Sequence, residues 1–370
     1  MEFRNLKKQY QVLKTDMDNA IWEVLHDCNF ISGSQVQALE DELASYVGVK
    51  HCITCANGTD ALTLMMMAWG VREGDAVFVP DFTFFSTGEV VSFEGATPVF
   101  VDVDRNTFNL DPDSLEEAII AVEKEGKLHP KAVIPVDLFG LPYDADRINK
   151  IAHEHGLLVL EDGAQGFGGL YKGHRACSLG DAATTSFFPA KPLGCYGDGG
   201  AVFTNDEVMA DLLKSIRIHG KGSMKYDNIR IGMNSRLDTI QAAILQVKLK
   251  AFKAYELEDV NNVASWYDET LGDSIDKPII PSGCLSSWAQ YTVKVDRRDE
   301  LQAKLKSNGI PSMVYYPKAM HSQKAFEGLK QYVDLSVTES LCKRVLSLPL
   351  DPYKSEEEIK IIASMVKEGC

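Results

Sequence analysis

The chain has 370 residues, of which 45% are hydrophobic and 25% are charged, and its formal net charge is −15. This length suggests about two domains, and the composition is that of an ordinary globular protein. The negative charge argues against an extended nucleic-acid-binding surface, although an anionic small ligand needs only a local positive site. There is no apolar run of about 18 residues, and none follows the N-terminus, so we expect neither a membrane span nor a signal peptide.

The cysteines indicate free thiols. Eight cysteines in 370 residues are too few for a disulfide scaffold, so we expect a reducing compartment and hence the cytoplasm. Cys52 and Cys55 have the spacing of a redox or metal motif, but they lie in a predicted buried strand. His153 and His155 are two residues apart on a predicted helix and would point to different faces. We therefore predict no metal site.

The first 250 residues show alternating strand and helix patterns. Residues 1–30 form an amphipathic pattern, and a second helix is predicted from Gln35 to Tyr46. Short apolar runs then alternate with helical patterns at Asp60–Trp69, Ser86–Glu94, Asp113–Glu125 and Ala145–His155. Such alternation predicts βαβ units and a mainly parallel seven-stranded sheet. The predicted strands are His51–Ala56, Ala76–Pro80, Pro98–Val103, Ala132–Val136, Leu157–Glu161, Ala183–Phe188 and Ala201–Thr204.

The last part of the chain has a different pattern. A long helix is predicted from about Asp238 to Asn262, and it joins the sheet domain to the remainder. Two strands (Ala289–Val295 and Met313–Tyr316) and two helices (Arg298–Asn308 and Glu356–Lys367) are predicted after it. We therefore predict a large α/β domain at residues 1–250 and a smaller C-terminal α+β domain at residues 251–370.

One segment, from Ser186 to Gly200, holds a lysine in an unusual frame. Lys191 lies between Pro189 and Pro192, and four glycines follow at positions 194, 197, 199 and 200. The prolines restrict the backbone, and the glycines permit another segment to approach closely. A surface lysine on a glycine-rich turn is one interpretation. The other is a lysine that forms a Schiff base with a carbonyl group at a fixed angle.

In parallel sheets a ligand binds at the carboxyl ends of the strands, so the residues that follow each predicted strand are informative. Asp162 and Gln165 follow the strand at 157–161. Asp162 could cap a helix, or it could hold the pyridine nitrogen of pyridoxal phosphate in its protonated form.

Two more strand ends carry candidate ligand-binding residues. The run Asn57-Gly58-Thr59-Asp60 opens a helix, where free N–H groups bind anions, and Ser186 could add a hydroxyl to the same phosphate. A plain helix cap explains the run equally well. Phe84 follows the strand at 76–80 and could stack on a flat ring, although a core phenylalanine is the more common case. Together these residues predict one cofactor site at the sheet edge.

These motifs also carry a family resemblance. Asn57-Gly-Thr-Asp-Ala-Leu, Glu161-Asp-Gly-Ala-Gln, the lysine segment and Asn234-Ser-Arg-Leu-Asp resemble the sugar aminotransferases of the DegT/StrS family. These are pyridoxal-phosphate enzymes of the aspartate-aminotransferase fold, fold type I. The resemblance extends over essentially the whole chain. It is strongest to the branch that aminates C3 of UDP-2-acetamido-2-deoxy-ribo-hexuluronate.

The resemblance implies a role for each matching residue. Lys191 would form the Schiff base, Asp162 would pair with the pyridine nitrogen, and Gln165 would lie near the ring's 3-oxygen. The phosphate would be bound by the loop at Gly58, by Thr59, by the backbone of Asp60 and by Ser186, with Phe84 stacked on the ring.

The resemblance also implies a homodimer with shared active sites. Asn234 would reach the phosphate of the partner's cofactor, and Arg236 would help to hold substrate there. Tyr315 and Tyr316 lie in the substrate loop, and Tyr315 stands where relatives commonly have histidine.

The implied reaction is transamination of a keto nucleotide-sugar, a UDP-linked 3-keto sugar or hexuluronate, with glutamate as amino donor. The product would be an amino sugar for a surface polysaccharide or related glycan. Lys191 must be neutral to act as a base, so its pKa should be depressed.

The alternatives are an aminotransferase for a dTDP-linked 3- or 4-keto-6-deoxysugar, a fold type I lyase and a non-catalytic regulator that binds pyridoxal phosphate. A nicotinamide-dependent oxidoreductase ranks last, because the glycines at 194–200 do not form Gly-x-Gly-x-x-Gly.

Overall fold

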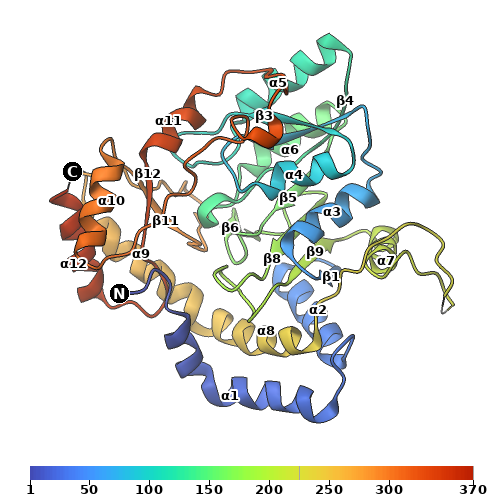
Figure 1. Ribbon diagram of the computed structural model, residues 1–370, viewed down its shortest axis with the longest axis horizontal. Coiled ribbons are helices and arrows are strands. Elements are labelled where there is room, and N and C mark those ends of the chain that lie inside the picture. The colour runs from blue at the N-terminus through green and yellow to red at the C-terminus, as the bar shows by residue number, and fades with distance from the viewer. Residues whose placement is uncertain (225, 370) are drawn as a thin grey trace.

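The computed structural model of the protein describes residues 1–224 and 226–369. In Figure 1 a large α/β part lies to the right, and a smaller part made mostly of the last third of the chain lies to the left. All seven strands predicted for the large domain are present. They are β1 (His51–Cys55), β2 (Asp75–Pro80), β3 (Thr97–Val101), β4 (His129–Val133), β5 (Leu158–Asp162), β8 (Ala182–Ser186) and β9 (Gly200–Thr204).

These strands form one sheet in the order β1-β9-β8-β5-β4-β2-β3. The pairs from β8 to β3 are parallel, and β9 runs antiparallel to both of its neighbours, so the predicted mainly parallel sheet is confirmed. Strand β4 begins at His129, three residues before the predicted start, and it ends at Val133 instead of Val136. Pro135 has no N–H to continue a ladder, which explains the early end.

Helices cover both faces of this sheet. In β2, Val77 and Val79 pack toward one face, and Ala76 and Phe78 pack toward the other. Because both faces are buried, the strands read as continuous apolar runs without alternation. Helices α3 (Gly58–Ala68), α4 (Ser86–Phe93) and α7 (Glu207–Ile216) cover the first face. Helices α5 (Pro112–Glu125), α6 (Ala145–Glu154), α2 (Ser34–Val47) and α8 (Thr239–Ala251) cover the second.

Local sequence signals fix where many of these helices begin. The side chains of Asp111 and Asp206 accept hydrogen bonds from the first-turn N–H groups of α5 and α7. Ser355 forms a capping box with Glu358 at the start of α12 (Glu356–Lys367), the helix predicted at those residues. Each such cap satisfies backbone donors that have no partner within the helix.

The smaller part has its own apolar core. Helices α9 (Leu257–Leu271), α10 (Arg298–Ser307) and α12 pack around the pair β11 (Tyr291–Lys294) and β12 (Val345–Leu348). This confirms the predicted helices at 298–308 and 356–367 and the strand at 289–295. The strand predicted at Met313–Tyr316 is wrong, because only Met313 pairs, with Ser347, before the chain leaves toward the large part.

The connection between the two parts is a long helical segment. Helices α8 and α9 are joined by a π-helical turn at Phe252–Glu256, so the helix predicted to end at Asn262 continues to Leu271. The division at residue 250 stays a prediction. Met320, Phe326 and Leu335, which belong to the predicted small domain, pack into the core of α3 and α4.

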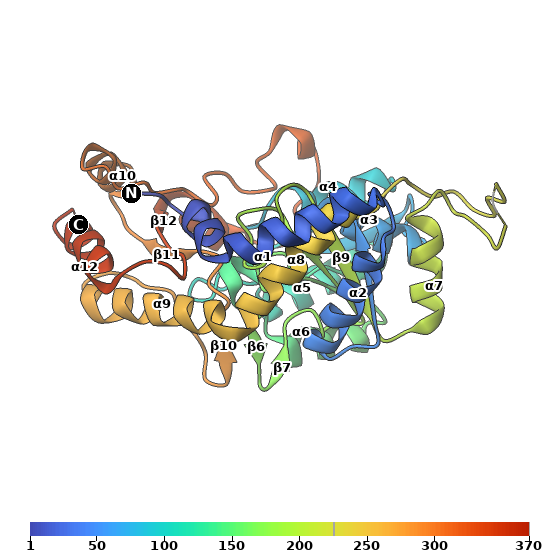
Figure 2. The same ribbon diagram turned by 90° about the horizontal axis from the view of Figure 1, so that it is seen from below.

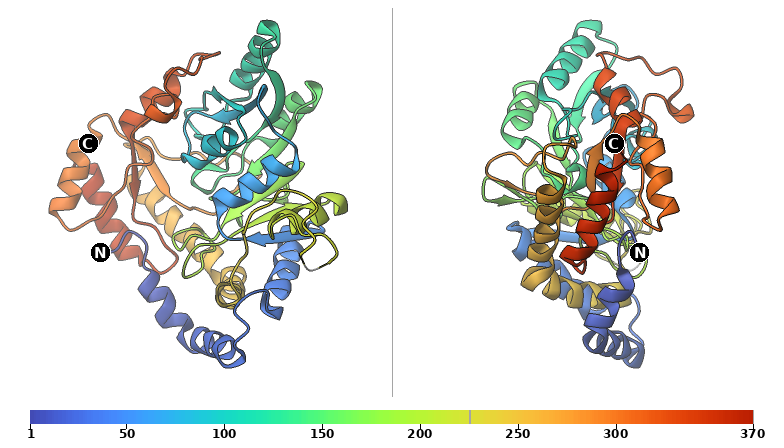
Figure 3. Two further views of the ribbon diagram at one scale, coloured as in Figure 1. Left: turned by 45° about the vertical axis from the view of Figure 1, so that its right-hand side comes forward. Right: turned by 90° about the vertical axis from the view of Figure 1, so that its left-hand side faces the viewer.

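Two further segments bear on the site. Helix α1 (Leu6–Asp27) lies along α8, and the residues before it contact the small part, where the N–H of Leu350 donates to the carbonyl of Phe3. The described residues of the segment after α7, 217–224 and 226–235, project from the body of the molecule (Figures 1, 2 and 3) and are called the projecting segment below. No helix within the described residues is both long and apolar enough to span a membrane.

Candidate active site

The cavity at the carboxyl ends of the strands has a volume of about 640 Å³, which is within the usual range for small-molecule sites. Residues that follow β1, β2, β5 and β8 line one side, and residues 315–323 line the other. The cavity brings together nine of the residues predicted from the sequence. These are Gly58, Thr59, Phe84, Asp162, Gln165, Ser186, Lys191, Tyr315 and Tyr316.

Lys191 is held by a tight turn after β8. Its N–H donates to the carbonyl of Phe188 at 2.8 Å, and a side chain at Gly194 would approach that same carbonyl within 2.6 Å. The guanidinium of Arg4, from the N-terminal segment, donates to the carbonyl of Ala190 at 3.0 Å. Burial lowers the pKa of Lys191, which is the direction expected for a lysine that acts as a base.

Asp162 is the buried carboxylate of the cavity, with 5% of its surface exposed. It accepts hydrogen bonds from the N–H of Ala164 at 3.2 Å and from the hydroxyl of Thr87 at 3.1 Å. Burial raises the pKa of Asp162, and the Ala164 N–H and the charge of Lys191 oppose that rise. Thr87, on α4, was not predicted, and its hydroxyl also lies 3.2 Å from the hydroxyl of Thr83 in the loop before that helix.

The start of α3 meets the end of β8 and forms the candidate anion site. The side chain of Asn57 caps the helix by accepting from the N–H of Asp60 at 2.8 Å. A Cβ atom at Gly58 would lie 2.7 Å from the Cβ of Ser186, so only glycine permits this approach. The helix N-terminus and two hydroxyls, from Thr59 and Ser186, therefore face one cavity.

Gln165 connects the sheet to the small-domain loop. Its side-chain oxygen accepts from the N–H of Phe139 at 2.9 Å, and its amide group donates to the Tyr316 hydroxyl at 3.4 Å. The Tyr316 ring lies 6.4 Å from the ring of Phe84, which is 54% exposed. An exposed ring at this position is available to a flat ligand, whereas a core phenylalanine would be covered.

Three predicted residues do not line this cavity. The N–H of Asp60 is bonded to Asn57, and its carboxylate accepts from the Ser235 hydroxyl at 2.6 Å. Asn234 pairs with Ile218 at the base of the projecting segment, and Arg236 lines a separate cavity of about 940 Å³ beside that segment. Within one chain, Asn234 and Arg236 are therefore away from Lys191.

A pair of buried carboxyls lies behind Asp162 and was not predicted. Glu161 accepts from the N–H groups of Cys177 and Leu179 through its two oxygens. Asp137 accepts from the N–H of Tyr143, and its other oxygen has no hydrogen-bond donor among the described residues. Burial raises the pKa of both carboxyls, and the charge of Glu161 raises that of Asp137 further, which favours a proton shared within the pair.

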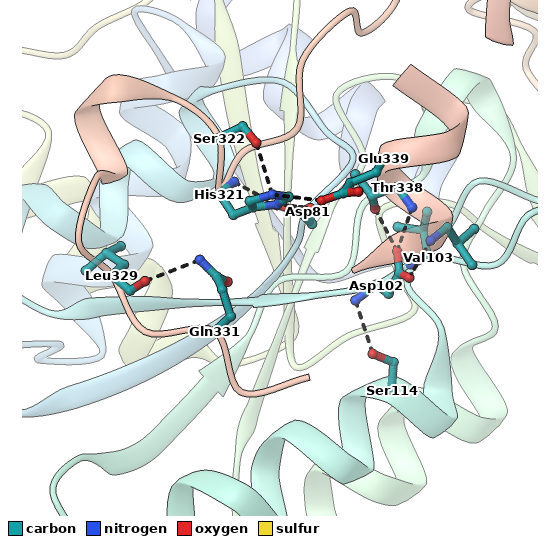
Figure 4. A network of polar contacts seen from close by, with 11 residues as sticks. Asp81, Asp102, Val103, Ser114, His321, Ser322, Leu329, Gln331, Thr338 and Glu339 are labelled. Carbon is teal, nitrogen blue, oxygen red and sulfur yellow. Dashed lines mark hydrogen bonds and ion pairs between the residues drawn. The ribbon is translucent and has the colours of Figure 1, made fainter. Parts of the chain in front are cut away.

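A second unpredicted pair anchors the loop that carries Tyr316 (Figure 4). Asp81, directly after β2, is fully buried and accepts from the N–H of His321 at 2.8 Å and from its ring Nδ1 at 2.6 Å. Nearby, Asp102 accepts from Val337 and Thr338 and so caps α11 (Ser336–Arg344). Two strand ends therefore hold residues 319–344 against the large part. These contacts join residues that are far apart in the chain, so no local sequence pattern predicts them.

Comparison with known proteins identifies the family. The profile of the DegT/DnrJ/EryC1/StrS aminotransferase family matches residues 11–367. The chain belongs to this family. The resemblance read from the motifs and the fold type I architecture are therefore confirmed, since a family aminotransferase from Brucella abortus is 47% identical and superposes with a TM-score of 0.98. The match covers 100% of this chain and 99% of that one.

Characterised relatives span nearly the whole chain. A UDP-2-acetamido-2-deoxy-3-oxo-D-glucuronate aminotransferase of Pseudomonas aeruginosa is 47% identical over 98% of this chain and 99% of its own length. A protein of Geobacillus stearothermophilus named pleiotropic regulatory protein is 41% identical over 98% of this chain and 97% of its own length. NtdA of Bacillus subtilis, solved with bound cofactor PMP, is 29% identical with a TM-score of 0.85, over 96% of this chain and 82% of that chain.

Proposed function

We propose that this protein is a pyridoxal-phosphate-dependent aminotransferase that transfers the amino group of glutamate to a UDP-linked keto sugar. The observation that carries the proposal is the shared cavity of Lys191, Asp162 and the α3 N-terminus. A primary amine, a buried carboxylate and an anion site fit the aldehyde, the pyridine nitrogen and the phosphate of that cofactor. When bound, the cofactor supplies an electron sink for the substrate carbanion.

The residues of the chain have distinct roles in this reaction. Lys191 Nζ would remove the proton from Cα of glutamate in one half of the cycle and deliver a proton to the keto carbon of the sugar in the other, and its lowered pKa favours the neutral amine that the first role needs. Asp162 keeps a positive charge on the ring nitrogen, and the bonds from Ala164 and Thr87 hold its carboxylate in place. The half-buried Tyr315 and Tyr316 cover the opposite side of the cavity, and Phe84, in the loop after β2, would stack on the ring from the strand-end side.

The substrate assignment is supported by the Pseudomonas relative, which acts on a UDP-linked 3-oxo sugar acid. We therefore propose a UDP-linked 3-keto sugar or hexuluronate as substrate and an amino sugar of a surface polysaccharide or related glycan as product. The free thiols among the described cysteines agree with a reducing cytoplasm. An aminotransferase for dTDP-linked keto-6-deoxysugars is the alternative within the family, and a non-catalytic regulator is suggested by the name of the Geobacillus relative.

An absorbance titration tests the cofactor and the donor. The purified protein should show a visible band that disappears when glutamate is added and returns with a keto sugar. Turnover is then compared between UDP-linked and dTDP-linked keto sugars. A protein that stays colourless with added pyridoxal phosphate would contradict the cofactor assignment. A coloured protein that glutamate does not change would favour the regulator.

We also propose that the active sites are shared in a homodimer. The projecting segment exposes Met224, Ile229 and Ile231, and exposed apolar side chains on an extended arm are typical of an interface. Docking of this arm on a second copy would bring Arg236 and Asn234 to the partner's cavity.

Subunit mixing tests the shared site. Lys191→Ala and Arg236→Ala homodimers should each have low activity, and their random mixture should recover about a quarter of the wild-type activity, because half the dimers contain one intact site. A mixture as inactive as its components would place both residues in one chain's site.

A further inference from the structure

Residues 314–323 form a turn that is fixed over the cavity at two points. At one end the Tyr316 hydroxyl is bonded to Gln165. At the other end the N–H of Met320 donates to the Asp81 carbonyl at 3.0 Å, and His321 binds the Asp81 carboxylate through its N–H and its ring (Figure 4). Both anchors lie on strand ends of the large part. The position of the residues between them, Pro317 to Ala319, is therefore set by the sheet.

Lys318 lies in the middle of this turn and lines the cavity. Its side chain is exposed, and among the described residues no carboxylate or carbonyl pairs with it. The other charged residues of the cavity are Lys191, Asp162 and Asp198. Lys191 and Asp162 are assigned to the cofactor, so Lys318 is the lysine that remains for substrate.

Arg4 is the other cation near the lysine loop, but it does not line the cavity, and its guanidinium is bonded to Ala190. The protein as a whole carries a net charge of −15. An anionic group that enters this cavity loses hydration and needs a local positive partner, because an unpaired charge is costly away from water. Lys318 is placed to be that partner.

We infer that Lys318 determines substrate specificity by binding the carboxylate of a hexuluronate, an inference that rests on the proposed function. The sugar ring must lie against the cofactor, between the strand ends and the anchored turn, so a carboxylate on that ring is within the same cavity as Lys318. The diphosphate lies outward with the nucleotide. The homodimer proposed above would bring to it the cavity beside the projecting segment. The described lining of that cavity contains His219, Lys221, Arg230 and Arg236 and no acidic residue.

Equilibrium binding of two stable ligands tests this role. UDP-N-acetylglucosaminuronate and UDP-N-acetylglucosamine share the nucleotide and diphosphate and differ in the carboxylate. The wild-type holoenzyme should bind the acid about fivefold to tenfold more tightly, which is the range of a partly exposed charge-assisted contact. Lys318→Met should abolish this preference and leave the dissociation constant of the neutral ligand within about twofold.

Matched variants sharpen the result. Lys318→Arg keeps the charge and should retain most of the preference, and Lys324→Met removes an exposed lysine outside the cavity and should change neither constant. The corresponding keto sugars should show the same preference in kcat/KM.

Three outcomes would overturn the inference. Equal weakening of both ligands in Lys318→Met would assign the lysine to the diphosphate, and an unchanged preference would exclude it from substrate binding. Wild-type protein that binds both ligands equally would overturn the role of Lys318 alone. Wild-type protein that binds neither would overturn the proposed nucleotide-sugar substrate, and the role of Lys318 with it.

Discussion

The two sides of the cavity are built differently. On the sheet side, which is formed by residues that follow the strands, Asp162 and Thr87 are buried and hydrogen-bonded to each other. Gly58 allows the N-terminus of α3 to lie against Ser186. On the opposite side, residues 315–318 are half-buried or exposed, and two anchors hold the turn. On the buried side, side chains are held by packing and hydrogen bonds, whereas the exposed side chains of the turn can be changed without disturbing a core.

This difference separates chemistry from substrate choice. Groups that bind a cofactor must keep their geometry and protonation, so they belong on rigid elements with satisfied hydrogen bonds. Groups that select the sugar need only be presented at the right place. The comparison predicts that changes on the sheet side remove the reaction, while changes on the turn alter which sugar reacts.

The largest effect is expected for Lys191→Ala. Without the amine, both the covalent attachment of the cofactor and the proton transfer at the substrate carbon are lost. Turnover should fall by more than about 10³-fold, since general acid–base catalysis alone contributes 10²–10⁴-fold. Coupled detection of 2-oxoglutarate, together with the visible spectrum, measures both losses.

Lys150→Ala is the matched control for this variant, because Lys150 is an exposed lysine on α6 and does not line the cavity. It should keep the wild-type turnover and spectrum. If Lys191→Ala retained turnover within tenfold of the wild type, the base would have to be another residue.

A smaller effect is expected at the anchor of the turn. His321→Ala leaves the fully buried carboxylate of Asp81 without its ring partner, so the turn loses one fixed point. We expect KM for the keto sugar to rise about tenfold, which corresponds to one charge-assisted bond. The rate of the glutamate half-reaction should stay within about threefold, because Lys191 and Asp162 are held by the sheet. Stopped-flow absorbance measures the two halves separately.

His321→Asn separates positioning from general loss of stability. Its amide can replace Nδ1 as a donor to Asp81, so it should recover part of the affinity. Asp81→Asn keeps an acceptor for the His321 N–H, so its KM for the keto sugar should lie between those of His321→Ala and His321→Asn. If His321→Ala slowed both half-reactions equally, the pair would support the whole fold and not the turn.

The sequence predicts the sheet side of the cavity better than the turn on its opposite side. All seven strands of the sheet were predicted because apolar runs and helical periodicities are local signals. Lys191, Asp162 and Thr59 could be predicted to lie together, and they do line one cavity, because each follows a strand and strand ends share one edge. The glycines at 58 and 194 were visible in the sequence, but the contacts that require them are seen only in three dimensions.

The unpredicted features depend on residues that are far apart in the chain. The pair of Asp81 and His321 spans 240 residues, and Arg4 reaches Ala190 across 186. No periodicity encodes such a contact. The strand predicted at Met313–Tyr316 was wrong because only Met313 pairs, with Ser347, while Tyr315 and Tyr316 line the cavity.

The smallest effect on activity, with a clear effect on stability, is expected for Asp137→Asn. We expect the native pair of Asp137 and Glu161 to hold a proton, because burial raises both native pKa values. The unfolded chain releases that proton above the ordinary carboxyl pKa. The native state therefore binds more protons than the unfolded state, and stability falls as pH rises. One proton corresponds to about 1.4 kcal/mol of unfolding free energy per pH unit.

Asparagine at position 137 can donate to Glu161 without a titrating proton. The unfolding free energy is measured by urea denaturation between pH 6 and 8. Its decrease with rising pH should be less steep for Asp137→Asn than for the wild type, by up to about 1.4 kcal/mol per pH unit. Glu117→Gln, at an exposed carboxyl on α5, should leave the slope unchanged. The infrared carbonyl band of a protonated carboxylic acid should be present in the wild type and absent from Asp137→Asn. Identical slopes and bands would mean that the pair is not protonated at neutral pH. The pair would then carry two buried negative charges behind Asp162, in place of the one charge that a shared proton leaves.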